Sequence, residues 1–303
     1  MGWTSSRQRY YVPQRTVDNK IRFVWLTDNH PGSVGDQRWL WTQQAIDYCN
    51  ETRPSALVNT GDMTTYGQTP LIWSVFYQLR DCHRPYLAVI GNHDEEENTL
   101  GAGNPNTTVL ESEAALGMSA PFNRTTTIES GDATVSARCF MLDTNIYNDN
   151  RSANHVVGDR VGLINGGLPG GYDREIGATQ RSWIASVLDG DSTSDMVLIF
   201  MHYWTNTTCV DINNLVDILV DDGRPSAVFC GHNHADADKL DHTTTYDSVT
   251  RRFYKAPAML ESGCWVDVAL SASGSSLIVD EMVLHNYTDP GGWLVKSPFT
   301  VAS

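Results

Sequence analysis

The stretch Ile21-Arg22-Phe23-Val24-Trp25-Leu26-Thr27-Asp28-Asn29-His30 joins an apolar run directly to a cluster of polar side chains. The apolar part, Ile21 to Leu26, predicts a β-strand that is buried on both faces, because short and nearly continuous apolar runs are typical of such strands. Residues 37–50 then carry apolar side chains at helical spacing and predict an amphipathic helix. The polar cluster therefore lies where a strand ends and its connection to a helix begins.

The same order of strands and helices continues along the chain. Further strands are predicted at residues 56–58, 86–90, 136–142, 196–200 and 227–230, and further helices at residues 71–79, 178–188 and 212–220. Strand–helix–strand order predicts parallel strands joined by right-handed crossovers. Two C-terminal runs, residues 265–270 and 277–284, flank a short polar turn and predict an antiparallel hairpin.

The expected organisation is one domain over residues 21–285, with an N-terminal arm at residues 1–20 and a C-terminal tail at residues 286–303. Residues 98–127 and 145–172 show little periodicity and are expected to be mostly irregular. The second of these segments is either a cap that faces a substrate or a surface excursion, since long loops beside a site take both forms.

Five short polar motifs each follow one of the predicted strands. They are Asp28-Asn29-His30, Gly61-Asp62, Gly91-Asn92-His93-Asp94, Met201-His202 and Gly231-His232-Asn233-His234. Ligands bind at the carboxyl ends of the strands in open α/β sheets, so these side chains are expected to converge on one edge. Asp, Asn and His also cap strand ends without binding anything, and that is the alternative for each motif taken alone. Together they offer enough oxygen and imidazole donors for two divalent ions, of Mn, Fe, Zn or Mg.

In this order the motifs resemble the calcineurin-like metallophosphoesterase superfamily, over residues 21–284. The later part of the chain is similar to the branch of cyclic-nucleotide phosphodiesterases and related phosphohydrolases. This similarity runs from Leu142-Asp143, through Gly177, Gln180 and Trp183, to Phe200-Met201-His202 and Gly231-His232-Asn233-His234. The resemblance implies a four-layer αββα sandwich with mixed sheets, and the expected fold also includes the C-terminal β-hairpin.

The resemblance also implies roles for particular residues. The implied metal ligands are Asp28, His30 and His234 for the first ion, Asn92, His202 and His232 for the second, and Asp62 as the bridge between them. His93 is implied to be the general acid, with Asp94 orienting it.

Two positions depart from the family pattern. Thr65 stands where an acidic residue often follows the bridging Asp by three positions. Tyr203-Trp204 follows His202 where many cyclic-nucleotide members have His-His-Pro, which weakens the assignment of a cyclic-nucleotide substrate.

The expected function is dinuclear metal-dependent hydrolysis of small phosphodiesters or phosphomonoesters, including nucleotides, by a metal-bridged hydroxide with His93 as general acid. One alternative is a structural or virion-associated protein that retains the fold and docks on a larger assembly through its N-terminal arm or C-terminal tail. Another is a nuclease of the same superfamily. A nuclease needs a basic groove, and Arg251-Arg252 is the only adjacent pair of basic residues in the chain.

The composition sets further limits on partners and location. A net charge of -15 disfavours long nucleic acid as a substrate, and no apolar run approaches the length that crosses a bilayer. The six Cys are scattered and predict buried free thiols in a reducing compartment, with disulfides left open. A cytoplasmic protein is expected, or alternatively a virion-associated one. The scarcity of Lys fits a halophilic host or its virus, and a GC-rich genome explains it equally well.

Overall fold

The computed structural model describes residues 17–65, 69–91, 93–94, 124–144, 146–148, 173–203, 209, 211–232, 242–246, 249–256, 258–259, 263–274, 276–286, 294–296 and 299–301. Two of the predicted site residues, Asn92 and His234, lie outside the described residues. So does most of the two segments that the sequence predicts to be irregular.

Two mixed sheets form the centre of the molecule. The first has the strand order β14-β13-β12-β1-β2-β3, with β15 also paired to β13. Its strands are β1 (Ile21–Leu26), β2 (Ala56–Asn59), β3 (Tyr86–Ala88), β12 (Cys264–Ser273), β13 (Ser276–Asn286), β14 (Leu294–Lys296) and β15 (Phe299–Val301). β1, β2 and β3 are parallel, and β12 runs antiparallel to β1.

The second sheet has the strand order β10-β11-β9-β8-β5-β4. Its strands are β4 (Arg124–Glu129), β5 (Ser136–Met141), β8 (Met196–Met201), β9 (Ser226–Cys230), β10 (His242–Tyr246) and β11 (Val249–Lys255). β5, β8 and β9 are parallel, as their helical connections require. β6 (Ile146–Asn148) and β7 (Asp173–Glu175) form a separate two-stranded ribbon.

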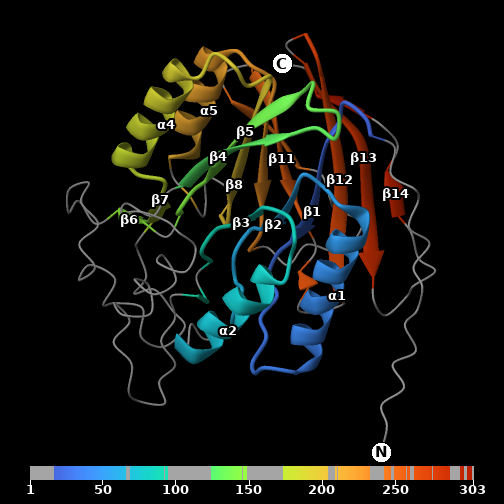
Figure 1. Cartoon of the computed structure of the whole chain (residues 1–303). Coiled ribbons are helices and arrows are strands. Elements are labelled where there is room, and N and C mark those ends of the chain that lie inside the picture. The colour runs from blue at the N-terminus through green and yellow to red at the C-terminus, as the bar shows by residue number, and fades with distance from the viewer. Residues whose placement is uncertain are drawn as a thin grey trace, which may run out of the picture.

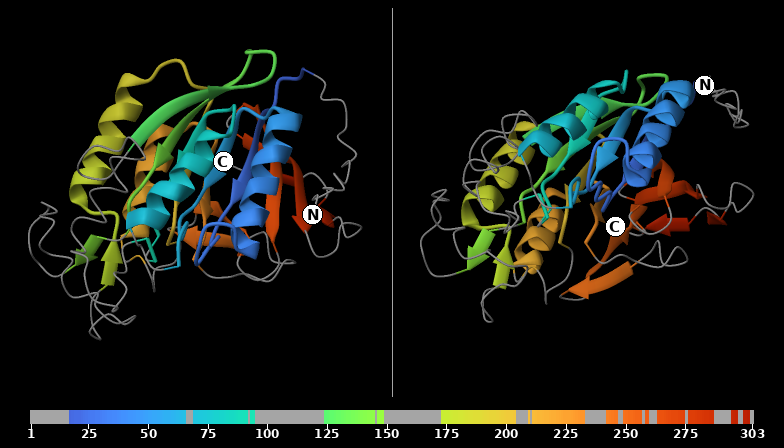
Figure 2. Two further views of the ribbon diagram at one scale, coloured as in Figure 1. Left: turned by 60° about the horizontal axis from the view of Figure 1, so that its bottom comes forward. Right: turned by 90° about the horizontal axis from the view of Figure 1, so that it is seen from below.

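Helices cover the outer face of each sheet. α1 (Gln37–Thr52) and α2 (Thr69–Arg80) pack on the first sheet, and α4 (Ala178–Gly190) and α5 (Ile212–Asp222) pack on the second. Figures 1 and 2 show the two helix pairs on opposite sides of the sheets. The molecule is therefore the four-layer αββα sandwich that the sequence predicts, with mixed sheets and the C-terminal hairpin β12–β13. Among the described helices, none has both the length and the apolar composition that a bilayer crossing requires.

Side-chain alternation along the central strands explains the layers. In β1, Phe23 and Trp25 point into the core between the sheets, whereas Val24 and Leu26 face the helices α1 and α2. Phe229 of β9 meets both aromatic residues edge-on, with ring centroids 5.0 and 5.2 Å away. Because each central strand is covered on both faces, its sequence is almost wholly apolar, which made these strands easy to predict.

The structure adds strands where the sequence pattern is weak. β4 forms at the end of a segment predicted to be irregular, and it pairs antiparallel with β5 along the edge of the second sheet. Its only fully buried side chain is Ile128, so it lacks the apolar run that marks a central strand. β14 and β15 lie within the predicted C-terminal tail and pair with β13.

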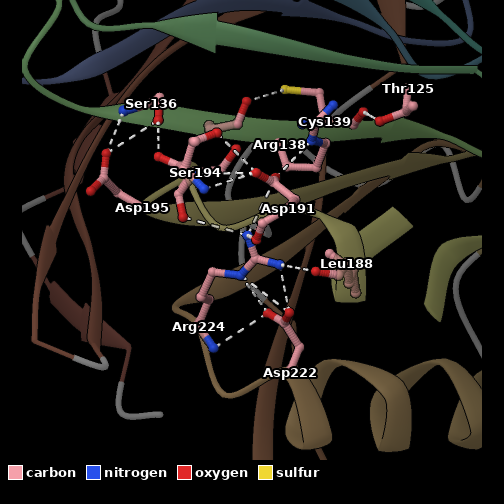
Figure 3. A network of polar contacts seen from close by, with 12 residues as sticks. Thr125, Ser136, Arg138, Cys139, Leu188, Asp191, Ser194, Asp195, Asp222 and Arg224 are labelled. Carbon is pink, nitrogen blue, oxygen red and sulfur yellow. Dashed lines mark hydrogen bonds and ion pairs between the residues drawn. The ribbon is translucent and has the colours of Figure 1, made fainter. Parts of the chain in front are cut away.

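A buried carboxylate ties the end of α4 to the second sheet (Figure 3). Asp191 follows α4, and its side chain is only 2% exposed. It accepts a hydrogen bond from Arg138 Nε of β5 at 2.8 Å, and Arg224 NH1 lies 3.3 Å away on its other side. The backbone N–H groups of Thr193 and Ser194 also donate to it. The hydrogen bond from Arg138 is the main reason that the pKa of Asp191 is held below its usual value.

Replacing this carboxylate is expected to destabilise the fold. Asp191→Asn should lower the free energy of unfolding by about 2 kcal/mol at pH 7, because it removes the carboxylate that pairs with the partly buried Arg138. It also removes one of the two carboxylates beside Arg224, which keeps its ion pair with Asp222. A lowered pKa stabilises the fold above the usual value of 3.8 and ceases to do so as the pH falls below it. The difference between variant and wild type in urea unfolding should therefore be constant from pH 8 to about pH 5 and shrink below about pH 4. Asp189→Asn, a change at an exposed residue in the last turn of α4, is the control, and equal losses in both variants would contradict the role of the network.

Candidate metal centre

The predicted site residues gather at one edge, where both sheets present the carboxyl ends of their parallel strands. Asp28 and His30 follow β1, Asp62 follows β2, and His93 with Asp94 follows β3. From the second sheet, His202 follows β8 and His232 follows β9. The site therefore takes side chains from both sheets.

Asp62 lies at the centre of this group, and it is 1% exposed. Its Oδ2 atom is 3.3 Å from Nε2 of His30 and also 3.3 Å from Nε2 of His202. Two ligand atoms that each lie about 2.1 Å from one ion are themselves about 3 Å apart, so these distances match a carboxylate oxygen placed between two ion positions.

Two groups of candidate metal ligands share this residue. One consists of His30, Asp62 and His93, and the other of Asp62, His202 and His232. Within each group the candidate ligand atoms lie within 4.8 Å of one another. Carboxylate and imidazole donors together suit borderline divalent ions, so the donor set fits a two-ion centre.

The electrostatics of the site favour bound cations. Burial alone would raise the pKa of Asp62, but the imidazoles of His202 and His30 hold it well below the usual 3.8. Burial alone would lower the pKa of His202, but the charge and hydrogen bond of Asp62 outweigh burial and raise the pKa of that imidazole to about 9. Burial, with a smaller contribution from the charge of Asp62, raises the pKa of Asp94 to about 6. The two buried carboxyl groups, Asp62 and Asp94, repel one another when both are ionised, and metal ions would supply positive charge beside them.

Backbone carbonyl groups set the orientation of two imidazole rings. Nδ1 of His202 lies 2.7 Å from the carbonyl oxygen of Thr60, and Nδ1 of His93 lies 3.0 Å from that of Thr65. A carbonyl oxygen only accepts, so each Nδ1 carries the proton. This leaves Nε2 of His202 to face Asp62, which is the usual arrangement of a metal-binding histidine.

Asp94 joins the loop after β2 to the loop after β3. Its carboxylate accepts hydrogen bonds from the backbone N–H of Gly91 at 3.0 Å, of Met63 at 3.2 Å and of Thr64 at 2.9 Å. The hydroxyl of Thr64 donates to it as well. In a parallel contact, the N–H of His93 donates to Oδ1 of Asp62 at 2.9 Å. The two loops are therefore joined by several hydrogen bonds next to Asp62.

The candidate ligands are held in an unusual backbone conformation. Among the described residues, six other than Gly have positive φ, and four of these are candidate ligands: Asp28 at 50°, His30 at 44°, Asp62 at 54° and His232 at 71°. Side chains rarely adopt this left-handed region, and such residues cluster at functional sites where the surrounding structure enforces them. Here the loops are bonded to one another, for example Asp28 N–H to the Gly61 carbonyl at 3.0 Å.

Glycines allow these loops to come close together. A Cβ atom on Gly91 would lie 2.1 Å from Oδ1 of Asp62, and one on Gly231 would lie 2.1 Å from the hydroxyl of Thr27. Thr27 in turn donates to Oδ2 of Asp28 at 2.7 Å. The glycines in the motifs therefore serve close packing around the candidate ligands.

Some residues around the site received no role from the sequence, although Thr65 and Tyr203 were noted there as departures from the family pattern. The ring of Tyr203 packs against His232, with centroids 4.2 Å apart, and Thr27 supports Asp28. Thr60 and Thr65 contact the rings of His202 and His93 through their carbonyl groups, which any residue possesses, so the residue type does not reveal these two contacts. Their positions beside Gly61-Asp62 and three residues after it were the only available signal.

A protein-family model, described as calcineurin-like phosphoesterase, matches residues 21–236 of the chain. The chain belongs to the calcineurin-like phosphoesterase family. This confirms the resemblance that the five motifs carry. The family depends on a dinuclear metal centre, so membership implies a metal-dependent phosphoester hydrolase.

Solved structures with the same fold include a dimetal phosphatase from Danio rerio, which is 14% identical with a TM-score of 0.60 over 94% of this chain and 99% of that one. The purple acid phosphatase PPD1 of yellow lupin is 13% identical with a TM-score of 0.56, over 93% of this chain and 54% of that one. GAP50, described as the anchor in the inner membrane complex of Plasmodium, is 12% identical with a TM-score of 0.54, over 94% and 89%. At these identities the likeness concerns the fold. A comparison with curated proteins found no match.

The close approach at Gly91 gives a test of the centre. Gly91→Ala should weaken Mn²⁺ binding by about 10-fold or more, because the new Cβ would displace the carboxylate of Asp62. Substitutions of residues that contact a metal ligand typically lower metal affinity by at least this factor. The measurement is calorimetric titration of metal-stripped protein, with circular dichroism to check folding. Gly190→Ala is the control, since a Cβ there meets nothing within 4 Å. Unchanged affinity in a folded Gly91→Ala variant would contradict the arrangement.

Proposed function

We propose that this chain hydrolyses small phosphodiesters or phosphomonoesters at a centre of two divalent metal ions. The observation that carries the proposal is the position of Asp62, whose Oδ2 lies 3.3 Å from the imidazoles of two separate ligand groups. A buried carboxylate shared in this way suits a bridge between two ions.

In the proposal, Asp28, His30 and His234 would hold the first ion, and Asn92, His202 and His232 would hold the second, with Asp62 shared. When bound, the two ions would orient the phosphate, lower the pKa of water and stabilise the charge that builds on phosphorus. The donor set is compatible with Mn, Fe, Zn or Mg.

His93 is the proposed general acid. Its ring lies edge-on to His30 with centroids 4.4 Å apart, so it borders the place where a phosphate would meet the ions. The carbonyl of Thr65 accepts from Nδ1, so a second proton on the ring, as in the imidazolium form, would be carried by Nε2. That proton would pass to the oxygen that departs and leave a neutral imidazole. In this proposal Asp94 orients His93 through the backbone, because it fixes the two loops that carry His93 and Asp62.

A structural role is the second candidate, and the likeness to GAP50 favours it because that protein is described as an anchor. The described part of the site counts against it. A scaffold released from catalysis would be free to lose its ligands, whereas His30, Asp62, His202 and His232 still belong to groups that could hold a metal ion. A nuclease is disfavoured by the net charge of -15. The location of the protein, cytoplasmic or virion-associated, and its docking on an assembly stay predictions.

The test is metal-dependent turnover by the purified full chain. Metal-stripped protein is loaded with each ion in turn and offered chromogenic phosphodiesters and phosphomonoesters, cyclic nucleotides, nucleotides and single-stranded DNA, at low and molar salt. Asp62→Asn and His93→Ala should each lower kcat by about 100-fold or more, by removing the bridge and the acid respectively.

Matched controls are Asp47→Asn and His83→Ala, which change exposed residues of the same types. Turnover that survives in both Asp62→Asn and His93→Ala would contradict the assigned site. A folded, metal-loaded wild type that turns over none of the panel would favour the structural role.

A further inference from the structure

Two cysteines meet at the end of the α1–α2 layer. Cys49 lies in the last turn of α1, and Cys82 lies two residues beyond the end of α2. Their Sγ atoms are 3.4 Å apart, and both side chains are buried, with Cys82 7% exposed and Cys49 0%. A disulfide bond is about 2.05 Å long, so a shift of little more than 1 Å would join the two sulfurs.

Hydrogen bonds on either side of the pair fix this approach. The side chain of Asn50, next to Cys49, donates to the carbonyl of Asp81 at 3.0 Å and accepts from the N–H of His83 at 2.7 Å. It therefore bonds to both chain neighbours of Cys82. The N–H of Cys82 itself donates to Leu79 at 3.0 Å and continues the end of α2.

The chemistry of this pair differs from that of the other cysteines. The contact with Cys49 lowers the pKa of the Cys82 thiol, whereas burial raises the pKa of Cys139 and of Cys230. Thiol–disulfide exchange proceeds through the thiolate, so Cys82 is the favoured first attacker. Within the described residues, neither cysteine belongs to a group of three metal-ligating side chains, so a bound metal is not the better explanation.

We propose that Cys49 and Cys82 form a disulfide bond when the protein meets a small-molecule disulfide such as oxidised glutathione. The Cys82 thiolate attacks one glutathione sulfur, forms a mixed disulfide and releases one glutathione thiolate. Cys49 then loses its proton, attacks the Cys82 sulfur and releases the second glutathione. The two cysteines lose two electrons and two protons, and one glutathione disulfide becomes two glutathione thiols.

The bond would stabilise the fold without touching the metal centre. α1 and α2 both begin just after candidate ligand loops and run away from them, so their last turns lie at the opposite end of the layer (Figure 1). The closed ring would contain β2, Asp62 and α2. Such a ring restricts the unfolded chain, which raises the melting temperature.

The experiment compares the full chain in reduced and in oxidised glutathione. Non-reducing peptide mapping should find the segments around Cys49 and Cys82 joined, and Tm should rise by about 5–10 °C, reversibly on reduction. Cys49→Ala and Cys82→Ala should each abolish the shift, while Cys264→Ala, another buried cysteine, should keep it. Free thiols at both positions, or glutathione retained on Cys82 without the cross-link, would overturn the proposal.

A separate observation concerns Thr65, which links the loop after β1 to His93. The hydroxyl of Thr65 donates to the carbonyl of His30 at 2.7 Å and lies 3.1 Å from that of Pro31. The N–H of Thr65 donates to Pro31 at 3.2 Å, and its carbonyl lies 3.0 Å from Nδ1 of His93. One residue therefore binds a candidate ligand loop with its side chain and the proposed acid with its backbone.

We infer that Thr65 is a positioning residue for His93, an inference that rests on the proposed function. The hydroxyl anchors the peptide group whose carbonyl holds the ring of His93, so loss of the hydroxyl lets the acid drift from the departing oxygen. A misplaced general acid slows the reaction most when the departing oxygen is strongly basic and leaves only with a proton. An alkyl phosphodiester needs that proton far more than a p-nitrophenyl phosphodiester does.

The test is Thr65→Val, which removes the hydroxyl at nearly constant volume, against Thr65→Ser, which keeps it. Thr65→Val should lower kcat for the alkyl ester about 10-fold more than for the p-nitrophenyl ester, with KM unchanged, and Thr65→Ser should restore both. Equal losses on both esters, or no rescue by Ser, would overturn the inference. Failure of the proposed function is distinguishable, because the wild type would then hydrolyse neither ester.

Discussion

A carboxylate buried between two imidazoles is the constraint around which the surrounding loops are built. Asp62 is almost fully removed from solvent, yet its pKa is low, so it is an anion in the interior. Such a charge is tolerated only with positive charge close by. The chain meets this need with the imidazole of His202, whose pKa Asp62 raises, and divalent ions held by the surrounding donors would add to it. The left-handed ligand residues and the closely packed glycines follow from crowding five loops around this one group.

The central part of the fold was predictable because residues buried between two layers must be apolar. β1, β8 and β9 lie between layers, so both of their faces must be apolar and the run is visible in the sequence. β4 was missed for the opposite reason. It is an edge strand with a single buried residue, Ile128, and its pairing with β5 depends on a partner that the local sequence does not indicate.

The sequence indicated which side chains would gather at the candidate site, but it did not indicate the backbone contacts around them or the substrate. The types and order of the motif residues were sufficient to bring Asp62, His30, His202 and His232 to one place. The contacts of Asp94 with three backbone N–H groups were not foreseeable, because those N–H groups belong to loops that approach only in three dimensions. The same holds for the carbonyls of Thr60 and Thr65, and for the substrate, which no single residue of the motifs specifies.

The origin of the ligands on two different sheets couples the centre to the assembly of the whole domain. His30 and Asp62 belong to the layer of β1 and β2, and His202 and His232 belong to the layer of β8 and β9. An ion held by both can bind only when the two halves of the sandwich are docked. By mass action, the binding free energy of such an ion would add to the free energy that holds the two halves together. A higher concentration of the metal would therefore make their separation rarer. The metal centre would thus act as a cross-link between the two sheets, and the stability that it adds to the domain would depend on the concentration of metal.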